Sequence, residues 1–159
     1  MDIFKYFNQE SVWLDIKVGS KTEAIDEMCG FAARALGLEK ALLLEVVVER
    51  ENLGSTSVGG GVAIPHGKTD LVDEVFLFLA RTAPGWELTD CDSPDGRPVR
   101  LLALLLIPDK PDQDHLRALA ALGRLWRTPQ NINLMLEAKD AKSFLETLSI
   151  IPGLQAPAQ

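Results

Sequence analysis

The sequence predicts an α/β protein, a three-layer α/β/α sandwich in which a central mixed sheet is flanked by helices. Strand-like and helix-like patterns alternate along the 159 residues, as in sheets that are covered by helices. Residues 98–107 are almost continuously apolar, which indicates a central strand with both faces buried. The sequence shows no repeat and no linker, so we expect residues 1–159 to form one domain, with a flexible tail over about residues 152–159.

The N-terminal third predicts one strand followed by two helices. Apolar side chains alternate with other residues at positions 11–18, as on one face of a strand. Ser20 and Glu23 have the spacing of a capping box, and Gly37 supplies a C-terminal stop for the helix between them. Three valines within residues 42–50 favour a strand. Because the apolar residues there recur at helical spacing, we interpret this segment as a helix.

Strands and turns are expected in the middle of the chain. Residues 62–64 predict a short strand, and residues 74–83 and 98–107 predict longer ones. The stretch 84–97 is rich in Asp, Ser, Pro and Gly, which are turn-forming residues. We therefore expect a connection there, with room for a short strand at residues 86–88.

Helices are expected in the C-terminal part. Asp112 or Asp114 can cap a helix with one apolar side. That side consists of Leu116, Leu119, Ala120, Leu122 and Trp126. Pro after Thr128 is typical of a first helical position, so a new helix is expected there. The last helix is expected to begin after Asp140.

The charge of the chain bears on its partners. The formal net charge is -7 and the isoelectric point is near 4.8. Affinity for the phosphate backbone of nucleic acid depends on clustered Lys and Arg, so nucleic acid is disfavoured as a partner. A basic protein surface is easier to accommodate.

The sequence also bears on the compartment. Its beginning shows neither an export signal nor a cleavage site. The longest apolar run, residues 101–107, is far shorter than the ~20 residues that span a bilayer. The two cysteines, Cys29 and Cys91, show no zinc or disulfide spacing. We expect a cytoplasmic protein without direct membrane insertion and without a bound metal or other cofactor.

Residues 54–69 concentrate the chemistry of the chain, because three consecutive glycines, several hydroxyls, a histidine and a lysine occur together there. The glycines permit positive φ and let backbone amides approach an anion. Pro65 stiffens the chain before His66, so we expect the histidine at a strand end beside a loop.

A histidine in this setting suits phosphoryl transfer. A neutral ring nitrogen is nucleophilic, and an unperturbed pKa near ~6.5 leaves much of the imidazole neutral at cytosolic pH. The transferred group needs oriented donors to stabilise its charge. The candidate donors are Arg50, Ser55, Thr56, His115 and the glycine-rich backbone, including Gly67.

Gly67, Lys68 and Thr69 also resemble the end of the nucleotide-binding signature G-x-x-x-x-G-K-[ST]. The first glycine of that signature would have to stand at position 62, which is Val62. A β-branched run that ends in Pro-His cannot form the cradle that wraps phosphates. We therefore exclude a nucleotide-binding loop.

The arrangement resembles the active-site signature of the phosphotransferase-system IIA domains of the mannitol/fructose type, including the nitrogen-regulatory IIA proteins. The residues that carry the resemblance are Arg50-Glu51, Gly54-Ser55-Thr56, Ala63-Ile64-Pro65-His66-Gly67-Lys68, Asp95-Gly96-Arg97-Pro98-Val99, Pro108 and His115-Leu116 through Leu122. The resemblance therefore covers nearly the whole chain.

The resemblance implies a phosphoryl carrier. It implies that His66 accepts phosphate from a histidine-phosphorylated carrier protein, that His115 borders the phosphorylation site, and that Arg50 is the active-site arginine. The phosphate either regulates a target protein, as in the nitrogen-type branch, or passes to a permease domain, as in sugar transport. A chain without a fused transporter favours the regulatory branch.

Alternatives are weighed residue by residue. Asp114 and His115 lie at a helix start, where free amides favour an anion. Arg50 can instead satisfy carbonyls at a helix end. Cys91 lies among aspartates, but a solvated turn explains that loop better than a metal site.

Other functions leave different signatures. An interaction module that shares the fold but is never phosphorylated would not need Pro65-His66 together with His115. A hydrolase is disfavoured, because the sequence shows neither a G-x-S-x-G nucleophile elbow nor a convincing Ser-His-Asp arrangement. We therefore expect His66 and His115 to be catalytic, and Arg50, Ser55, Thr56 and Gly67 to bind the phosphoryl group.

Overall fold

The computed structural model of the chain describes residues 9–110 and 113–149. The expected Asp112 cap and the expected tail from residue 152 lie outside these ranges. A 3₁₀ turn, Gln9–Ser11, leads directly into the first strand.

A six-stranded sheet forms the centre of the described part of the chain. Its strands are β1 (Val12–Ile16), β2 (Ser57–Gly59), β3 (Val62–Ala63), β4 (His66–Thr69), β5 (Phe76–Thr82) and β6 (Leu101–Pro108). The order across the sheet is β1-β5-β6-β3-β2, and β4 also pairs with β6. Strand β6 runs antiparallel to β5 and parallel to β3 and β4. The predicted mixed sheet is confirmed.

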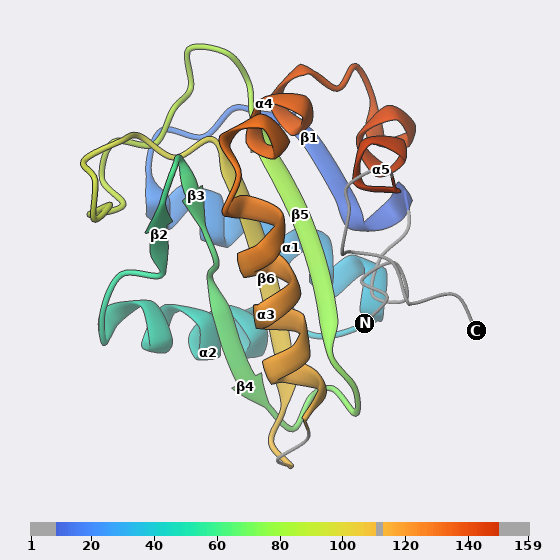
Figure 1. The fold of residues 1–159 in the computed structure, drawn as a ribbon. Helices are drawn as coiled ribbons and strands as arrows, with labels where there is room; N and C mark the ends of the chain where they lie inside the picture. Colours follow the sequence, from blue (N-terminus) through green and yellow to red (C-terminus); the bar gives the residue numbers. More distant parts are fainter. Residues whose placement is uncertain (1–8, 111–112, 150–159) are drawn as a thin grey trace.

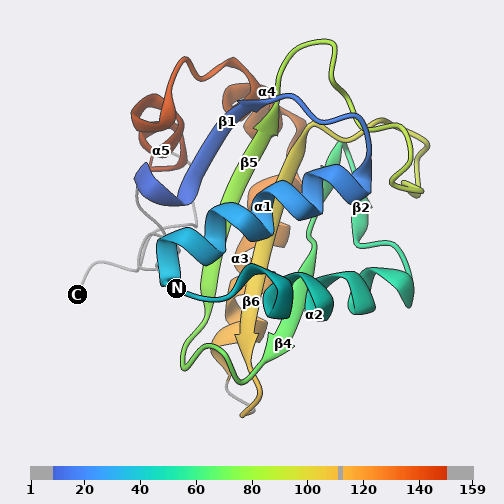
Figure 2. The same cartoon turned by 180° about the vertical axis from the view of Figure 1, so that it is seen from behind.

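Helices cover both faces of this sheet. One face carries α1 (Lys21–Leu36) and α2 (Lys40–Asn52), and the other carries α3 (Asp114–Trp126), α4 (Pro129–Glu137) and α5 (Ala141–Ser149). Figure 1 looks onto the face with α3, and Figure 2 onto the face with α1 and α2. The fold is therefore the three-layer α/β/α sandwich that the sequence predicts.

Strand β6 explains why its sequence is apolar throughout. Leu101, Ala103 and Leu105 pack in the cluster with α3, α4 and α5. Leu102 and Leu104 pack in the cluster with α1 and α2. Since successive side chains of a strand point to opposite faces, a strand between two cores needs apolar residues at every position.

The local signals of the first two helices are also confirmed. The Ser20 hydroxyl accepts a hydrogen bond from the Glu23 backbone amide, and Gly37 ends α1 in the left-handed conformation, with φ of 69°. The Glu23 carboxylate accepts from the backbone amide of Gly19, one residue before the expected cap. The ambiguous segment 42–50 lies within α2, as helical spacing indicates.

Two local predictions are corrected. Asp114 is the first residue of α3 rather than its cap, since the cap position is Gln113, whose side chain makes no capping hydrogen bond. The segment around Leu88 forms only an isolated bridge to Val99 instead of a strand. By contrast, Pro129 begins α4, and the Asp140 carboxylate accepts from the Ser143 amide at the start of α5, as expected.

Candidate functional site

His66 begins β4, immediately after a break in the hydrogen-bonding ladder. Strands β3 and β4 lie along the same edge of β6, and the register of residue pairs is the same on both sides of the break. Pro65 has no N–H to donate to a ladder, and the Ile64 amide donates to the carbonyl of Thr56 instead. The Pro65 carbonyl still accepts from the Leu105 amide. Strands β3 and β4 therefore keep the same register against β6 on both sides of the break.

The break fixes the protonation pattern of the imidazole. The Nδ1 atom of His66 lies 2.8 Å from the backbone carbonyl oxygen of Ile64. A carbonyl oxygen only accepts, so Nδ1 carries the proton and donates. In the neutral ring this leaves the lone pair on Nε2. The free lone pair of the neutral His66 ring is therefore on Nε2.

This tautomer gives a testable prediction. In nitrogen-15 NMR spectra of the neutral imidazole, we expect His66 to show a protonated Nδ1 and an unprotonated Nε2. The reason is the carbonyl of Ile64, which stabilises one tautomer only. A spectrum dominated by the Nε2–H form would contradict the assignment.

An open cavity lies beside the histidine. It has a volume of about 540 Å³. His66 and Lys68 contribute from β4, and Glu49 and Arg50 contribute from the end of α2. Apolar residues complete the lining: Val46, Leu53, Ile107, Pro108, Leu116 and Leu119. The cavity thus combines an imidazole with two cationic side chains and one carboxylate in a mostly apolar setting.

Lys68 and Glu49 are the charged cavity residues that are absent from our predicted site residues. In a strand, side chains two residues apart lie on the same face, so the period from His66 to Lys68 is the signal that could have indicated the lysine. Glu49 gives no comparable signal, because it reaches the cavity only through the way that α2 packs beside β4, which the local sequence does not indicate.

Arg50 shows features of both predicted roles. Its Nη1 donates to the carbonyl of Gly54 at 3.0 Å, which is the helix-end function of a cation. The side chain also lines the cavity with His66. Arg50 and His66 are therefore brought together, 16 positions apart in the sequence.

Ser55 and Thr56 are engaged elsewhere. The Ser55 hydroxyl donates to the carbonyl of Cys91, and the hydroxyl of the buried Thr56 donates to the carboxylate of Glu51. Neither residue lines the cavity beside His66. Direct contact of these hydroxyls with a phosphoryl group stays a prediction, and it would require the loop to rearrange.

These hydrogen bonds support the histidine indirectly. The buried carboxylate of Glu51 accepts from both the amide and the hydroxyl of Thr56, and it pairs with Lys21 at 3.3 Å. The carbonyl of Thr56 then accepts from the Ile64 amide, and the carbonyl of Ile64 accepts from His66. A continuous series of contacts thus joins the end of α2 to the imidazole.

Gly67 has a packing reason to be glycine. A Cβ atom at this position would lie 2.8 Å from Cγ1 of Val46 and 3.2 Å from Cγ2 of Val47. The backbone of β4 therefore runs directly against α2. Whether the Gly67 amide binds phosphate stays a prediction.

His115 lies in the first turn of α3, and its side chain is outside the described part of the structure. The next residue, Leu116, lines the cavity with His66. The N-terminus of α3 is therefore at the cavity, although the two histidines are 49 positions apart in the sequence. The catalytic role of His115 stays a prediction.

The three consecutive glycines lie elsewhere than expected. Gly59, Gly60 and Gly61 form the turn between β2 and β3, with φ of 87°, 66° and 83°. The amide of Gly60 already donates to the carboxylate of Asp95, at 2.8 Å. The interpretation of these glycines as an anion-binding frame around His66 is wrong, because the turn holds a side chain of the protein itself.

The turn predicts a specific titration. Hydrogen bonds from the Gly60 and Arg97 amides lower the pKa of Asp95 below its ordinary 3.8. A carboxyl group with a depressed pKa loses its stabilising contribution as pH falls through the folded-state value. We expect the Gly60 amide resonance to titrate with a midpoint below pH 3.8. Asp95→Asn should abolish that transition, and a midpoint above 3.8 would contradict the assignment.

The fold and the histidine cavity define a class of protein. Residues 5–150 match the family described as "Phosphoenolpyruvate-dependent sugar phosphotransferase system, EIIA 2". The chain belongs to this family and is a phosphotransferase-system EIIA domain, hence a phosphotransferase component.

Within this family, both regulatory and sugar-specific relatives are similar to the chain. A nitrogen regulatory protein of Bradyrhizobium diazoefficiens is 37% identical over 147 residues, 92% of this chain and 94% of the relative. A fructose-specific EIIA component of Haloferax volcanii is 32% identical over 141 residues, 88% and 90% of the two chains. The crystal structure of nitrogen regulatory protein IIA-Ntr from Neisseria meningitidis has a TM-score of 0.83 and 30% identity, with 90% and 96% covered.

No helix in residues 9–110 and 113–149 has both the length and the apolar character needed to cross a bilayer.

Proposed function

We propose that this EIIA domain is a cytoplasmic phosphoryl carrier and that Nε2 of His66 accepts the phosphoryl group. The observation that carries the proposal is the hydrogen bond from Nδ1 of His66 to the carbonyl of Ile64. This hydrogen bond holds the ring proton on Nδ1 and leaves the Nε2 lone pair available. The open cavity beside the ring gives a donor protein access to it.

The donor in this proposal is a small carrier protein that is phosphorylated on histidine. The Nε2 lone pair attacks phosphorus, the N–P bond of the donor breaks, and the donor nitrogen recovers the electron pair. The His66 ring becomes cationic as its own N–P bond forms. The carbonyl of Ile64 faces Nδ1–H and stabilises that charge.

The negative charge of the phosphoryl oxygens also needs donors. Phosphoryl transfer depends mainly on positioning and on electrostatic stabilisation. Arg50 and Lys68 line the cavity and supply guanidinium and ammonium groups. His115, at the start of α3, is proposed to add a hydrogen bond from its ring, and the amide of Gly67 to contribute from β4.

The phosphorylation state is proposed to regulate a partner protein, as in a nitrogen-type regulator. The similarity to the Bradyrhizobium and Neisseria proteins supports this branch. Transfer to a permease domain for sugar uptake is the second candidate, and the similarity to the fructose-specific component favours it. In both cases the chemistry at His66 is the same.

The test is to incubate the chain with phosphoenolpyruvate, the energy-coupling enzyme and the carrier, and to measure the intact mass. We expect a gain of ~80 Da, the mass of one phosphoryl group, and none in His66→Ala. The matched control is His115→Ala, which should gain the same mass more slowly. A gain that persists in His66→Ala would sink the proposal.

A third candidate is an interaction module that is never phosphorylated. Binding to a partner by the wild type and by His66→Asp distinguishes it. A regulator should respond to the added negative charge, whereas a partner that binds both proteins equally supports the static module.

A further inference from the structure

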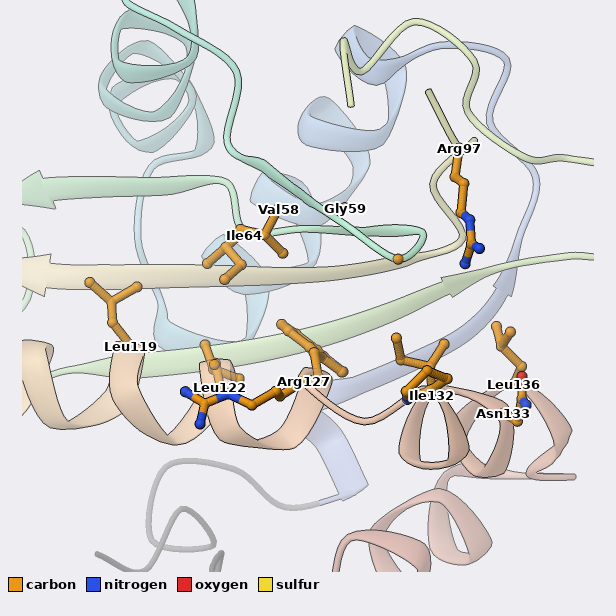
Figure 3. A pocket seen from close by; sticks show the side chains of 14 residues that line it. Val58, Gly59, Ile64, Arg97, Leu119, Leu122, Arg127, Ile132, Asn133 and Leu136 are labelled. Carbon is orange, nitrogen blue, oxygen red and sulfur yellow. The ribbon is translucent and has the colours of Figure 1, made fainter. Parts of the chain in front are cut away.

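A second and larger cavity lies on the same side of the sheet as α3. It is an open groove of about 700 Å³ between the β2–β3 hairpin and the helices α3 and α4. Figure 3 shows Val58 and Ile64 on the sheet side, with Leu122 and Ile132 opposite them on the helix side. None of the predicted catalytic or phosphate-binding residues is among the described residues that line it.

The floor of the groove is apolar. Ile64, Leu122, Trp126 and Ile132 are buried, and each contributes to the lining. Trp126 turns its indole N–H away from solvent, toward the sulfur of Met135 at 3.3 Å. The volume lies in the range of roughly 300–1,000 Å³ that is typical of small-molecule sites. A concave floor of this kind suits a compact apolar body better than a flat protein surface.

The charged side chains that line the groove are both cationic. Its described lining contains Arg97, Arg127 and Asn133 but no carboxylate, although the whole chain carries a net charge of -7. Figure 3 shows Arg97 beside the hairpin and Arg127 on the helix side. Arg97 has an exposed ion pair with Asp95 at 3.8 Å, a contact that solvent screens strongly. Both guanidinium groups can therefore pair with an anion that enters from solvent.

We propose that this groove binds a small amphipathic anion, a molecule with an apolar body and one carboxylate or phosphate group. The body lies against Ile64, Leu122 and Ile132, and the anionic group pairs with a guanidinium group at the rim. The charge complementarity between the cationic rim of an acidic protein and the ligand is the argument for this occupant. An acidic segment of a partner protein is the alternative that the experiment must separate.

The groove adjoins the histidine cavity. Leu119 lines both. Ile64 places its side chain in the groove, while its carbonyl accepts from His66. A bound ligand would therefore contact the same residue, Ile64, whose carbonyl sets the tautomer of His66. The binding proposal itself does not depend on phosphorylation.

Gly123 offers a way to block the groove without disturbing the core. It lies within α3 and lines the groove, and a Cβ atom there would meet nothing within 4 Å. Gly123→Leu should fill the space, whereas Gly123→Ala adds only a methyl group. Both replacements favour the helix, so a loss of binding in the leucine variant alone cannot come from unfolding.

The probes are octanoate, 1-octanol and octylamine, which share one chain and differ in charge. We expect saturable binding of octanoate to the full chain by NMR titration, with shifts at Ile64, Leu122 and Ile132. Octanol should bind more weakly and octylamine more weakly still. Arg97→Gln and Arg127→Gln should each weaken octanoate binding about two- to fivefold, as expected for exposed charge pairs.

Gly123→Leu should abolish the saturable binding, and Gly123→Ala should retain it. The proposal is overturned if octanoate does not saturate the wild type, which is the result expected if only a protein segment fits the groove. It is equally overturned if octylamine binds as well as octanoate, or if Gly123→Leu leaves binding unchanged. None of these outcomes bears on whether His66 is phosphorylated, so the two proposals fail separately.

Discussion

Replacing Arg81 with methionine is expected to lower the free energy of unfolding by about 1–3 kcal/mol, the cost of leaving buried acceptors without a hydrogen-bond partner. Arg81 lies in β5 and is only 4% exposed. Its Nη1 donates to the carbonyls of Met135, Leu136 and Ala138, which end α4. Methionine fills a similar volume but leaves these carbonyls without their donor, and a buried unsatisfied acceptor is costly.

The acidic partner of Arg81 provides the matched control. Asp15 accepts from Nε and Nη2 of the guanidinium, but its side chain is half exposed and can be solvated. Asp15 also has a positive φ of 57°, which asparagine tolerates. Asp15→Asn should therefore cost only about 0–1 kcal/mol.

Urea denaturation of the two variants measures both effects. If Arg81→Met lowers the free energy of unfolding by less than about 1 kcal/mol, the α4 carbonyls do not depend on this side chain for their hydrogen bonds. Amide exchange in α4 gives a second measurement, because the helix should open more often once its C-terminal carbonyls lose the guanidinium.

The sequence could not have indicated this role of Arg81. Periodicity correctly predicts that residues 74–83 contain a strand, because alternation is a local property. The carbonyls that Arg81 binds are 54 to 57 positions away, and backbone carbonyls carry no sequence signal. What a buried charge contacts becomes visible only once the helices are placed.

The candidate site likewise combines one feature that the local sequence predicts with one that depends on distant residues. The position of His66 near a strand end follows from Pro65 and the short apolar run before it, and the structure has it at the start of β4. The prediction that the three glycines surround His66 was wrong, because glycine permits a positive φ but does not specify what its backbone amide will bind. The answer, Asp95, lies 35 positions away from Gly60.

Gly67→Ala is the substitution expected to separate packing from chemistry at the site. The added Cβ would lie 2.8 Å from Val46, closer than van der Waals contact allows. Overpacking of this kind costs about 1–3 kcal/mol. Because α2 must move away from β4, and because α2 carries Glu49 and Arg50 into the cavity, the proposed phosphorylation of His66 should also slow. Urea denaturation and the rate of mass gain measure the two effects.

The second variant, Val46→Ala, removes the Cγ1 atom that the new Cβ would meet. In the double variant the 2.8 Å contact is absent and the 3.2 Å approach to Cγ2 of Val47 remains, so part of the lost stability should return, with a coupling above about 0.5 kcal/mol in a double-mutant cycle. Alanine keeps the backbone amide at position 67. Phosphorylation should therefore recover together with stability, whether that amide binds phosphate or not. If Gly67→Ala alone keeps full stability, the tight contact between α2 and β4 is refuted. If the double variant is stable but is no longer phosphorylated, packing of β4 against α2 does not account for the effect of position 67 on phosphorylation.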